Sequence, residues 1–154
     1  MAIIIIEAMQ GTVRALLVKP GKGVKSATRD FVEVTADGFD GDHHTGVSRR
    51  RQILLMSGSV LDELDLEPGD IYENVVIDGF DVMSLHEGQQ LRLGNALVTV
   101  TIPCEPCTQM DRVRGGLQGD LKDRRGMFVK VVEPGIVRIG DPVCEESAVE
   151  SSRK

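Results

Sequence analysis

The sequence predicts an all-β fold with a few short helices, arranged as a barrel or a sandwich. Strand-like segments recur at short intervals, and 17 of the 154 residues are glycine. Glycine supplies the tight turns that a chain of many short strands requires. Aromatic residues make up only 3% of the chain and tryptophan is absent. The core must therefore be built from Val, Ile, Leu and Met.

Nine segments have the composition of β-strands. The period is clearest where Val98, Val100 and Ile102 alternate with threonines, because successive side chains of a strand point to opposite faces. The predicted strands are residues 3–7, 12–18, 31–35, 52–56, 72–77, 90–93, 97–102, 127–132 and 136–139.

Helix is expected in only three short segments, residues 57–64, 106–113 and 117–123. In the first, Ser57 is a suitable N-cap and Val60, Leu61 and Leu64 share one face. The other two are short enough to form single turns. We therefore expect no alternating βαβ units and no parallel sheet of the Rossmann type.

Length and charge restrict the class of protein. At 154 residues the chain is expected to form one domain over residues 1–144, followed by a polar, frayed tail over residues 145–154. The net charge of −6 argues against a nucleic-acid partner. Basic residues nevertheless cluster at 49–51 and 122–125, so a local anion site is compatible with an acidic protein.

Three cysteines do not make a disulfide framework, which favours a reducing compartment. The apolar N-terminal segment lacks basic residues and is interrupted by Glu7. It resembles neither a secretory signal nor a membrane span. We therefore predict a cytoplasmic protein with no membrane partner.

The strongest candidate for chemistry is Cys107. The predicted strand stops at Pro103, and Pro106 suits the first position of a helix because proline has no N–H to lose. A cysteine in that first turn would face unpaired backbone N–H groups and the positive end of the helix dipole. Both favour the thiolate, which ligates metals and attacks electrophiles. We expect Cys107 at the floor or rim of a pocket, with Cys104 more buried.

The CxxC pair formed by Cys104 and Cys107 has other interpretations. A structural zinc site would need two more ligands, and only Cys144 and three histidines are available, without a matching spacing. A thioredoxin-type redox pair should open a helix inside a βαβ unit. Both cysteines could also be small buried residues, an interpretation that suits Cys104 better than Cys107.

Two polar segments interrupt the strand pattern. In the Gly/Asp/His-rich loop 38–46, His43 could donate to a bound oxyanion, whereas Asp42 could simply cap a turn. Asn74 disfavours a strand unless its amide is used by the backbone or by a ligand.

The arginines at 49–51 offer guanidinium groups suited to phosphate, although a solvated charge run is the alternative. Strand alternation would point Arg49 and Arg51 one way and Arg50 the other. All three therefore cannot line one pocket.

In combination, these segments resemble a MOSC domain, the module found at the C-terminus of molybdenum-cofactor sulfurases. The resemblance spans roughly residues 10–144, and the order and spacing of its pieces make it specific. The pieces are residues 38–43, 51–56, 73–74 with 79–81, 85–88 leading into 91–94, 103–107, 125–129 and 135–141.

The resemblance implies a closed or nearly closed β-barrel, for which we expect at least six strands. It also implies a molybdopterin-type molybdenum cofactor. The family's characteristic cysteine matches Cys107. In related amidoxime-reducing enzymes this cysteine is the protein ligand of molybdenum, which would make Cys107 both metal ligand and catalytic residue. The anionic pterin phosphate gives Arg49, Arg50, Arg124 and Arg125 a binding role, beside His43 and Asn74.

The function implied by this resemblance is reduction of N-oxygenated compounds. The chain has no iron–sulfur, flavin or pyridoxal-phosphate module, so an electron-donor protein is expected. An alternative is a non-enzymatic carrier that passes sulfur or the cofactor to a molybdoenzyme client through a Cys107 persulfide or thiolate. A third is a binding module that has lost the metal and keeps a structural CxxC.

Overall fold

A computed structural model of the chain describes residues 10–43 and 45–146 and contains a closed β-barrel. Seven strands pair in a ring, and antiparallel pairing of the first with the last, Gly11 opposite Val143, closes it. Around the ring these are β1 (Gln10–Val18), β11 (Pro142–Glu145), β7 (Gln90–Leu93), β8 (Ala96–Pro103), β9 (Met127–Glu133), β5 (Ile53–Ser57) and β6 (Val75–Asp78). The prediction of a closed barrel with at least six strands is confirmed.

Four short strands complete the β-structure. β2 (Ala27–Arg29) pairs with β1, and a separate sheet contains β10 (Gly135–Arg138), β3 (Phe31–Thr35) and β4 (Gly38–Phe39). Within the described residues, the pairing of β5 with β6 is the only parallel one. The expected absence of a Rossmann-type sheet is thus confirmed for the described part of the chain.

The strand predictions miss three short strands and misplace the start of a fourth. β2, β4 and β11 were not predicted, because strands of two to four residues carry too little periodicity to detect. The predicted strand 72–77 begins only at Val75, since Tyr72 has a φ of 67° that no strand accommodates. The predicted strand 3–7 lies outside the described residues. β11 reaches Glu145, so the first residue of the predicted tail belongs to the barrel.

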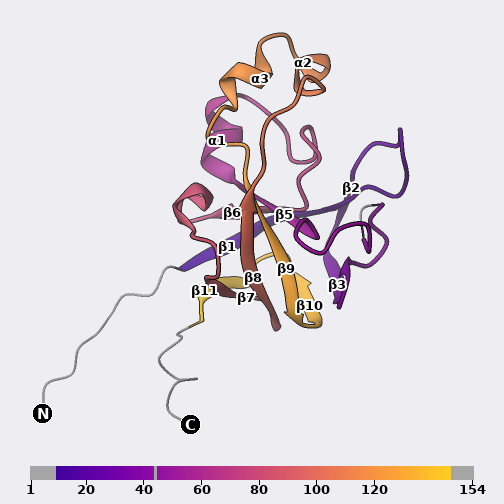
Figure 1. The fold of residues 1–154 in the computed structure, drawn as a ribbon, viewed down its shortest axis with the longest axis vertical. Coiled ribbons are helices and arrows are strands. Elements are labelled where there is room, and N and C mark those ends of the chain that lie inside the picture. Colours follow the sequence, from indigo (N-terminus) through magenta and orange to yellow (C-terminus); the bar gives the residue numbers. More distant parts are fainter. Residues whose placement is uncertain (1–9, 44, 147–154) are drawn as a thin grey trace, which may run out of the picture.

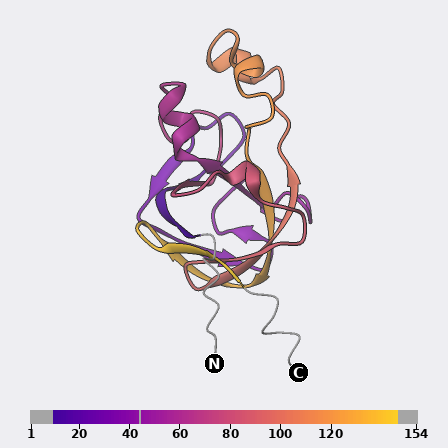
Figure 2. The ribbon, with the colours of Figure 1, turned by 90° about the vertical axis from the view of Figure 1, so that its left-hand side faces the viewer.

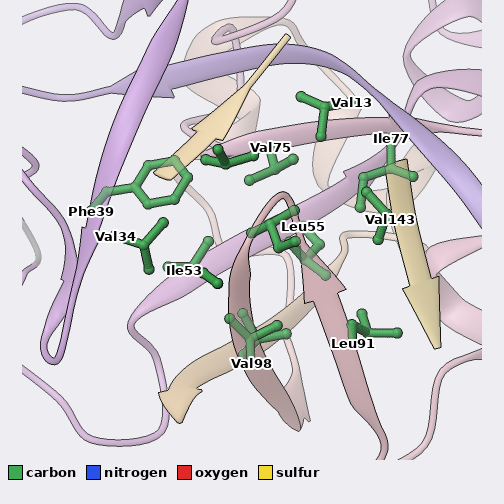
Figure 3. Packing of buried hydrophobic residues seen from close by; sticks show 14 of the residues in the cluster. Val13, Val34, Phe39, Ile53, Leu55, Val75, Ile77, Leu91, Val98 and Val143 are labelled. Atoms are coloured by element: carbon green, nitrogen blue, oxygen red, sulfur yellow. The ribbon is translucent and has the colours of Figure 1, made fainter. Parts of the chain in front are cut away.

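Two apolar cores lie on opposite faces of the same strands. The inner core fills the barrel with residues such as Leu55, Ile77 and Val98 (Figure 3). The outer core places Met56 of β5 and Val76 of β6 against three helices. Because β5 is covered on both sides, all five of its residues are buried.

The three helices gather at one end of the molecule, beyond the barrel strands (Figure 1), and the turned view shows the same grouping (Figure 2). They are α1 (Gly58–Glu63), α2 (Met110–Val113) and α3 (Leu117–Asp120), with a 3₁₀ turn, η1 (Val82–Ser84), beside the barrel. We call the helices and their connections, residues 58–73 and 104–126, the cap. None of the described helices has the length and apolar character needed to cross a membrane.

Helix α1 begins after Ser57 as predicted, but the Ser57 side chain does not cap it. Its hydroxyl instead accepts a hydrogen bond of 2.8 Å from the backbone N–H of Val82. Tertiary contact with η1 therefore takes the oxygen that the sequence pattern assigned to the helix end.

Candidate functional site

A cavity of about 590 Å³ lies where the cap meets the barrel. This volume is typical of sites for small organic ligands. Its walls come from the loop after β1, the segment before β5, the turn before β6, and the two ends of the cap segment 104–126. The polar and sulfur-bearing residues in these walls are Lys19, Lys22, His43, Ser48, Arg51, Gln52, Tyr72, Asn74, Cys104, Glu105, Cys107, Gln109, Met110 and Arg125.

Both cysteines of the CxxC pair line this cavity. Cys107 is exposed and Cys104 is partly buried, which confirms the expected order of exposure. The expected helix start at Pro106 is wrong, because α2 begins at Met110, whose N–H donates to the Cys107 carbonyl at 3.0 Å. Met110 is buried in the outer core, and its packing sets where the helix starts. Cys107 therefore lies in the turn before the helix.

Cys104 has the environment of a neutral thiol. Its backbone N–H donates to the Gly126 carbonyl at 2.9 Å, which fixes Cys104 beside the start of β9. Burial raises the pKa of the Cys104 thiol above its ordinary value, and the nearby charge of Arg125 opposes this only in part. Of the two sulfurs, Cys107 is therefore the more accessible to a ligand.

Positive charge dominates the cavity walls although the protein as a whole is acidic. Lys19, Lys22, Arg51 and Arg125 face a single acidic lining residue, Glu105. Opposite charge in a concave site attracts anionic ligands and retains them through charge-assisted hydrogen bonds.

Arg125 is the most constrained of these cations. Its side chain is buried, with 5% of the residue exposed, and its Nη2 donates to the Ile71 carbonyl. Its Nη1 is buried and has no hydrogen-bond partner among the described residues. Oε1 of Glu73 is likewise buried without a hydrogen-bond partner in the described part of the chain, and the opposite charges of Glu73 and Arg125 attract each other. Arg125 therefore adds positive charge to the cavity wall while Glu73 partly compensates it.

The arginines predicted from the sequence to bind a phosphate lie in different surroundings. Arg50 pairs with Glu87 at 3.5 Å and Arg124 with Glu63 at 2.6 Å, both on the surface. Neither these two nor Arg49 line the cavity, whereas Arg51 and Arg125 do. Clustering in the sequence located a basic region but did not give the direction of each side chain.

Asn74 lines the cavity, but its amide is used by the protein. Its Oδ1 accepts from the N–H of Leu54 at 2.9 Å, and its Nδ2 donates to the Leu17 carbonyl and to Asp42 Oδ1, both at 3.2 Å. Asp42 Oδ1 also accepts from the N–H of Lys19 at 2.8 Å. Of the two uses predicted for the Asn74 amide, the structure shows the first. Asn74 connects β1, β5 and the loop that carries His43.

Sequence reasoning missed the wall formed by Lys19, Lys22 and Tyr72. Lys19 Nζ lies 4.2 Å from the centroid of the Tyr72 ring, a cation–π contact. The available signals were a Lys-Pro-Gly-Lys-Gly turn after a strand and the chain's single tyrosine beside Glu73 and Asn74. They become neighbours only through the pairing of β1 with β6.

Glu73 supports this wall from behind. It is buried, and its Oε2 accepts from the N–H of Gly69 at 3.0 Å. Burial raises the pKa of Glu73, while backbone hydrogen bonds and the charge of Arg125 act in the opposite direction. Glu73 and Arg125 thus fix the turn that presents Tyr72, since Arg125 holds the carbonyl of Ile71.

The zinc interpretation of the CxxC pair finds no ligand set. Across residues 10–43 and 45–146, no group of three or more His, Cys, Asp or Glu side chains is placed to hold a metal ion. A metal held by the described residues would therefore have at most two protein ligands of these types and would need the remainder from another molecule.

Comparison with known proteins agrees with this architecture. The sequence profile of the MOSC domain family matches residues 40–144. No curated protein sequence matches the chain.

Solved structures share the fold at low sequence identity. YuaD of Bacillus subtilis superposes with a TM-score of 0.79 at 20% identity, covering 92% of this chain and 99% of that one. YiiM of Escherichia coli superposes with a TM-score of 0.68 at 20% identity, covering 88% of this chain and 70% of that one. YiiM of Geobacillus stearothermophilus superposes with a TM-score of 0.72 at 17% identity, covering 89% of this chain and 75% of that one. At these identities the likeness establishes the fold.

Proposed function

Because the chain belongs to the MOSC domain family, which is related to the C-terminal domains of molybdenum-cofactor sulfurases, we propose that its cavity binds a molybdopterin-type cofactor. We further propose that the loaded protein reduces N-oxygenated compounds. The observation that carries this proposal is the presence of an exposed thiol, Cys107, and four cationic side chains in one cavity of about 590 Å³.

The residues present fit such a group. Molybdenum in this cofactor takes soft sulfur ligands, and Cys107 supplies one. The pterin carries an anionic phosphate, for which the four cationic lining residues, Lys19, Lys22, Arg51 and Arg125, are suited. Cys104 is less exposed than Cys107, and burial raises the pKa of its thiol, so Cys107 is the preferred ligand.

The chain's own residues would bind the cofactor and orient it in the cavity. Cys107 would hold the metal, the cations would hold the phosphate, and Asn74 would position the loops that carry them. When bound, the cofactor supplies the two-electron chemistry that converts N–OH to N–H, with two protons taken up and water released. Electrons would come from a separate donor protein, and Cys107 would be the catalytic residue contributed by the chain.

The test begins with protein produced in a host that makes the cofactor. We expect about one equivalent each of molybdenum, measured by elemental analysis, and of pterin, measured by fluorescence after oxidation. Cys107→Ser should lose the metal and all reduction of amidoximes or N-hydroxylated purines with an artificial donor, because a neutral hydroxyl replaces a soft anion.

Cys104→Ser is the matched control and should retain the metal. Arg51→Ala should lower cofactor retention about tenfold, as expected for loss of one charged hydrogen bond. Excess cofactor should restore activity in Arg51→Ala but not in Cys107→Ser. Full metal content and full turnover in Cys107→Ser would contradict the proposal.

The exposure of Cys107 favours one second candidate, a carrier of sulfur or cofactor without turnover of its own. A sulfur that must reach a client protein needs an accessible carrier thiol. Mass spectrometry of the intact protein distinguishes the two. A persulfide on Cys107 formed by transfer of sulfane sulfur from a donor persulfide, together with no reductase activity, would support the carrier.

A further inference from the structure

A second cavity, of about 680 Å³, adjoins the Cys107 cavity. The two share the side chains of Tyr72 and Gln109 as a common wall. The second cavity lies between the loop before β2, the turn 68–70 and helix α2, and it contains neither cysteine. A molecule lying across Tyr72 and Gln109 would therefore extend from this cavity into the one that Cys107 lines.

Lys25 and Arg112 supply positive charge to the second cavity. Both are exposed, and neither side chain has a hydrogen bond or ion pair with another described residue. The one acidic residue in its walls is Asp70, whose Oδ2 accepts from the N–H of Glu67 at 2.9 Å. The two cations are thus available to an anion.

Hydrogen bonds hold Tyr72, which forms part of the shared wall, in an unfavourable backbone conformation. Tyr72 has a φ of 67°, a conformation that side chains other than glycine rarely adopt. Its N–H donates to the Gly69 carbonyl at 3.1 Å, and the N–H of Gly69 donates to the buried Glu73. A Cβ on Gly69 would lie 2.7 Å from a methyl group of Leu17, so this turn requires glycine at position 69.

We propose that the second cavity is the anion subsite for the substrate, and this inference rests on the proposed function. The substrate class is an N-oxygenated compound with a phosphate remote from its N–O group, such as an N-hydroxylated nucleoside monophosphate. The phosphate binds Lys25 and Arg112, the planar part lies against Tyr72 and Gln109, and the N–O end reaches the Cys107 cavity. Two cavities are needed because cofactor and substrate each require a volume of this order.

The test uses equilibrium binding to protein prepared without cofactor, so that it does not depend on turnover. Isothermal titration with N6-hydroxyadenosine and its 5′-monophosphate should show the monophosphate binding about tenfold more tightly. Lys25→Ala and Arg112→Ala should each remove most of that preference and leave nucleoside binding unchanged. Lys25→Glu should invert it. Lys130→Ala, an exposed lysine on β9 outside both cavities, is the matched control.

Equal binding of nucleoside and monophosphate, or a preference that survives in Lys25→Ala and Arg112→Ala, overturns the proposal. The anion could instead belong to an extension of the cofactor itself. In that case the two variants would lower molybdenum and pterin content in protein from a cofactor-making host, which also overturns it. Failure of the proposed function is seen separately, as wild-type protein without molybdenum.

Discussion

The inside of the barrel and the wall between barrel and cap are built on opposite principles. The inner core is a cluster of apolar side chains, most of them from strands of the closed ring and the rest from β3, β4, β10, η1 and Leu85. The cavity wall buries Glu73, Asn74 and Arg125 among helices of only four to six residues. Stability is therefore concentrated in the barrel, whereas the polar groups that face a ligand are fixed by a few specific hydrogen bonds.

The contrast lies within single strands as well as between regions. In β5, Leu55 points into the barrel, while Met56 packs under the cap. A substitution one position along the strand therefore tests a different region. Four substitutions should distinguish the barrel interior from the cavity wall, with effects that decrease from Leu55→Ala to Arg124→Ala.

Leu55→Ala should have the largest effect on stability. Leu55 is completely buried in the inner core, and truncation of such a leucine removes about 2–5 kcal/mol from the free energy of unfolding. Urea denaturation measures this loss. Cofactor content per folded molecule should not change, and a parallel loss of cofactor would show that the barrel interior and the cavity are coupled.

Asn74→Ala should affect both regions. The substitution leaves the buried N–H of Leu54 and the carbonyl of Leu17 without their partner, at about 2 kcal/mol in unfolding free energy. Unlike Leu55→Ala, it should also lower cofactor retention, because Asp42, which accepts from the N–H of Lys19, loses one of its hydrogen bonds.

Asn95→Ala is the matched control for Asn74→Ala, since its Oδ1 accepts from the N–H of Ile136 at 2.6 Å on an exposed turn outside the cavity. Asn95→Ala should lower the free energy of unfolding but leave cofactor retention unchanged. Equal cofactor retention in the two asparagine variants would contradict the positioning role of Asn74.

Glu73→Gln should change how stability depends on pH. Burial raises the pKa of Glu73 in the folded protein above its ordinary value of 4.5, so the folded state binds this proton more tightly than the unfolded state. The stability contribution of Glu73 is therefore complete below pH 4.5 and is lost as pH rises through the folded pKa.

Glutamine keeps an acceptor for the N–H of Gly69 but cannot ionise. The unfolding free energy of Glu73→Gln, relative to wild type, should therefore increase as pH rises above 4.5. Denaturation curves collected between pH 4 and 8 measure this difference. A constant difference across that range would show that the wall holds Glu73 at its ordinary pKa.

Arg124→Ala should have the smallest effect. The Arg124–Glu63 pair lies on the surface, where ion pairs contribute less than about 1 kcal/mol. Cofactor content, measured as molybdenum per protein, should equal that of wild type, because Arg124 does not line the cavity. A clear loss would restore Arg124 to the anion site that the sequence alone suggested.

The barrel was easier to predict than the site because a regular pattern of apolar residues along the chain indicates a strand. The alternation in residues 97–102 and the apolar run in β5 identified their strands to within a residue or two. The chemistry of Cys107 and the interruption at Asn74 were also visible in the sequence. The direction of an arginine, however, depends on loop geometry, which explains why Arg50 was chosen and Arg51 was underestimated. The contact of Lys19 with Tyr72 joins residues far apart in the chain, and no local pattern reports it.

Closure of the barrel also has a consequence for how the chain folds. The closing pair joins Gln10 in β1 to Cys144 in β11, 134 positions apart in the sequence. Contacts of such long range impose a high contact order and slow folding. During synthesis β11 leaves the ribosome after every other described strand, so β1 and β7 wait with unpaired edges that can pair with other chains. We therefore expect the ring to close only after translation, and nascent chains that stop before β11 to be prone to aggregation.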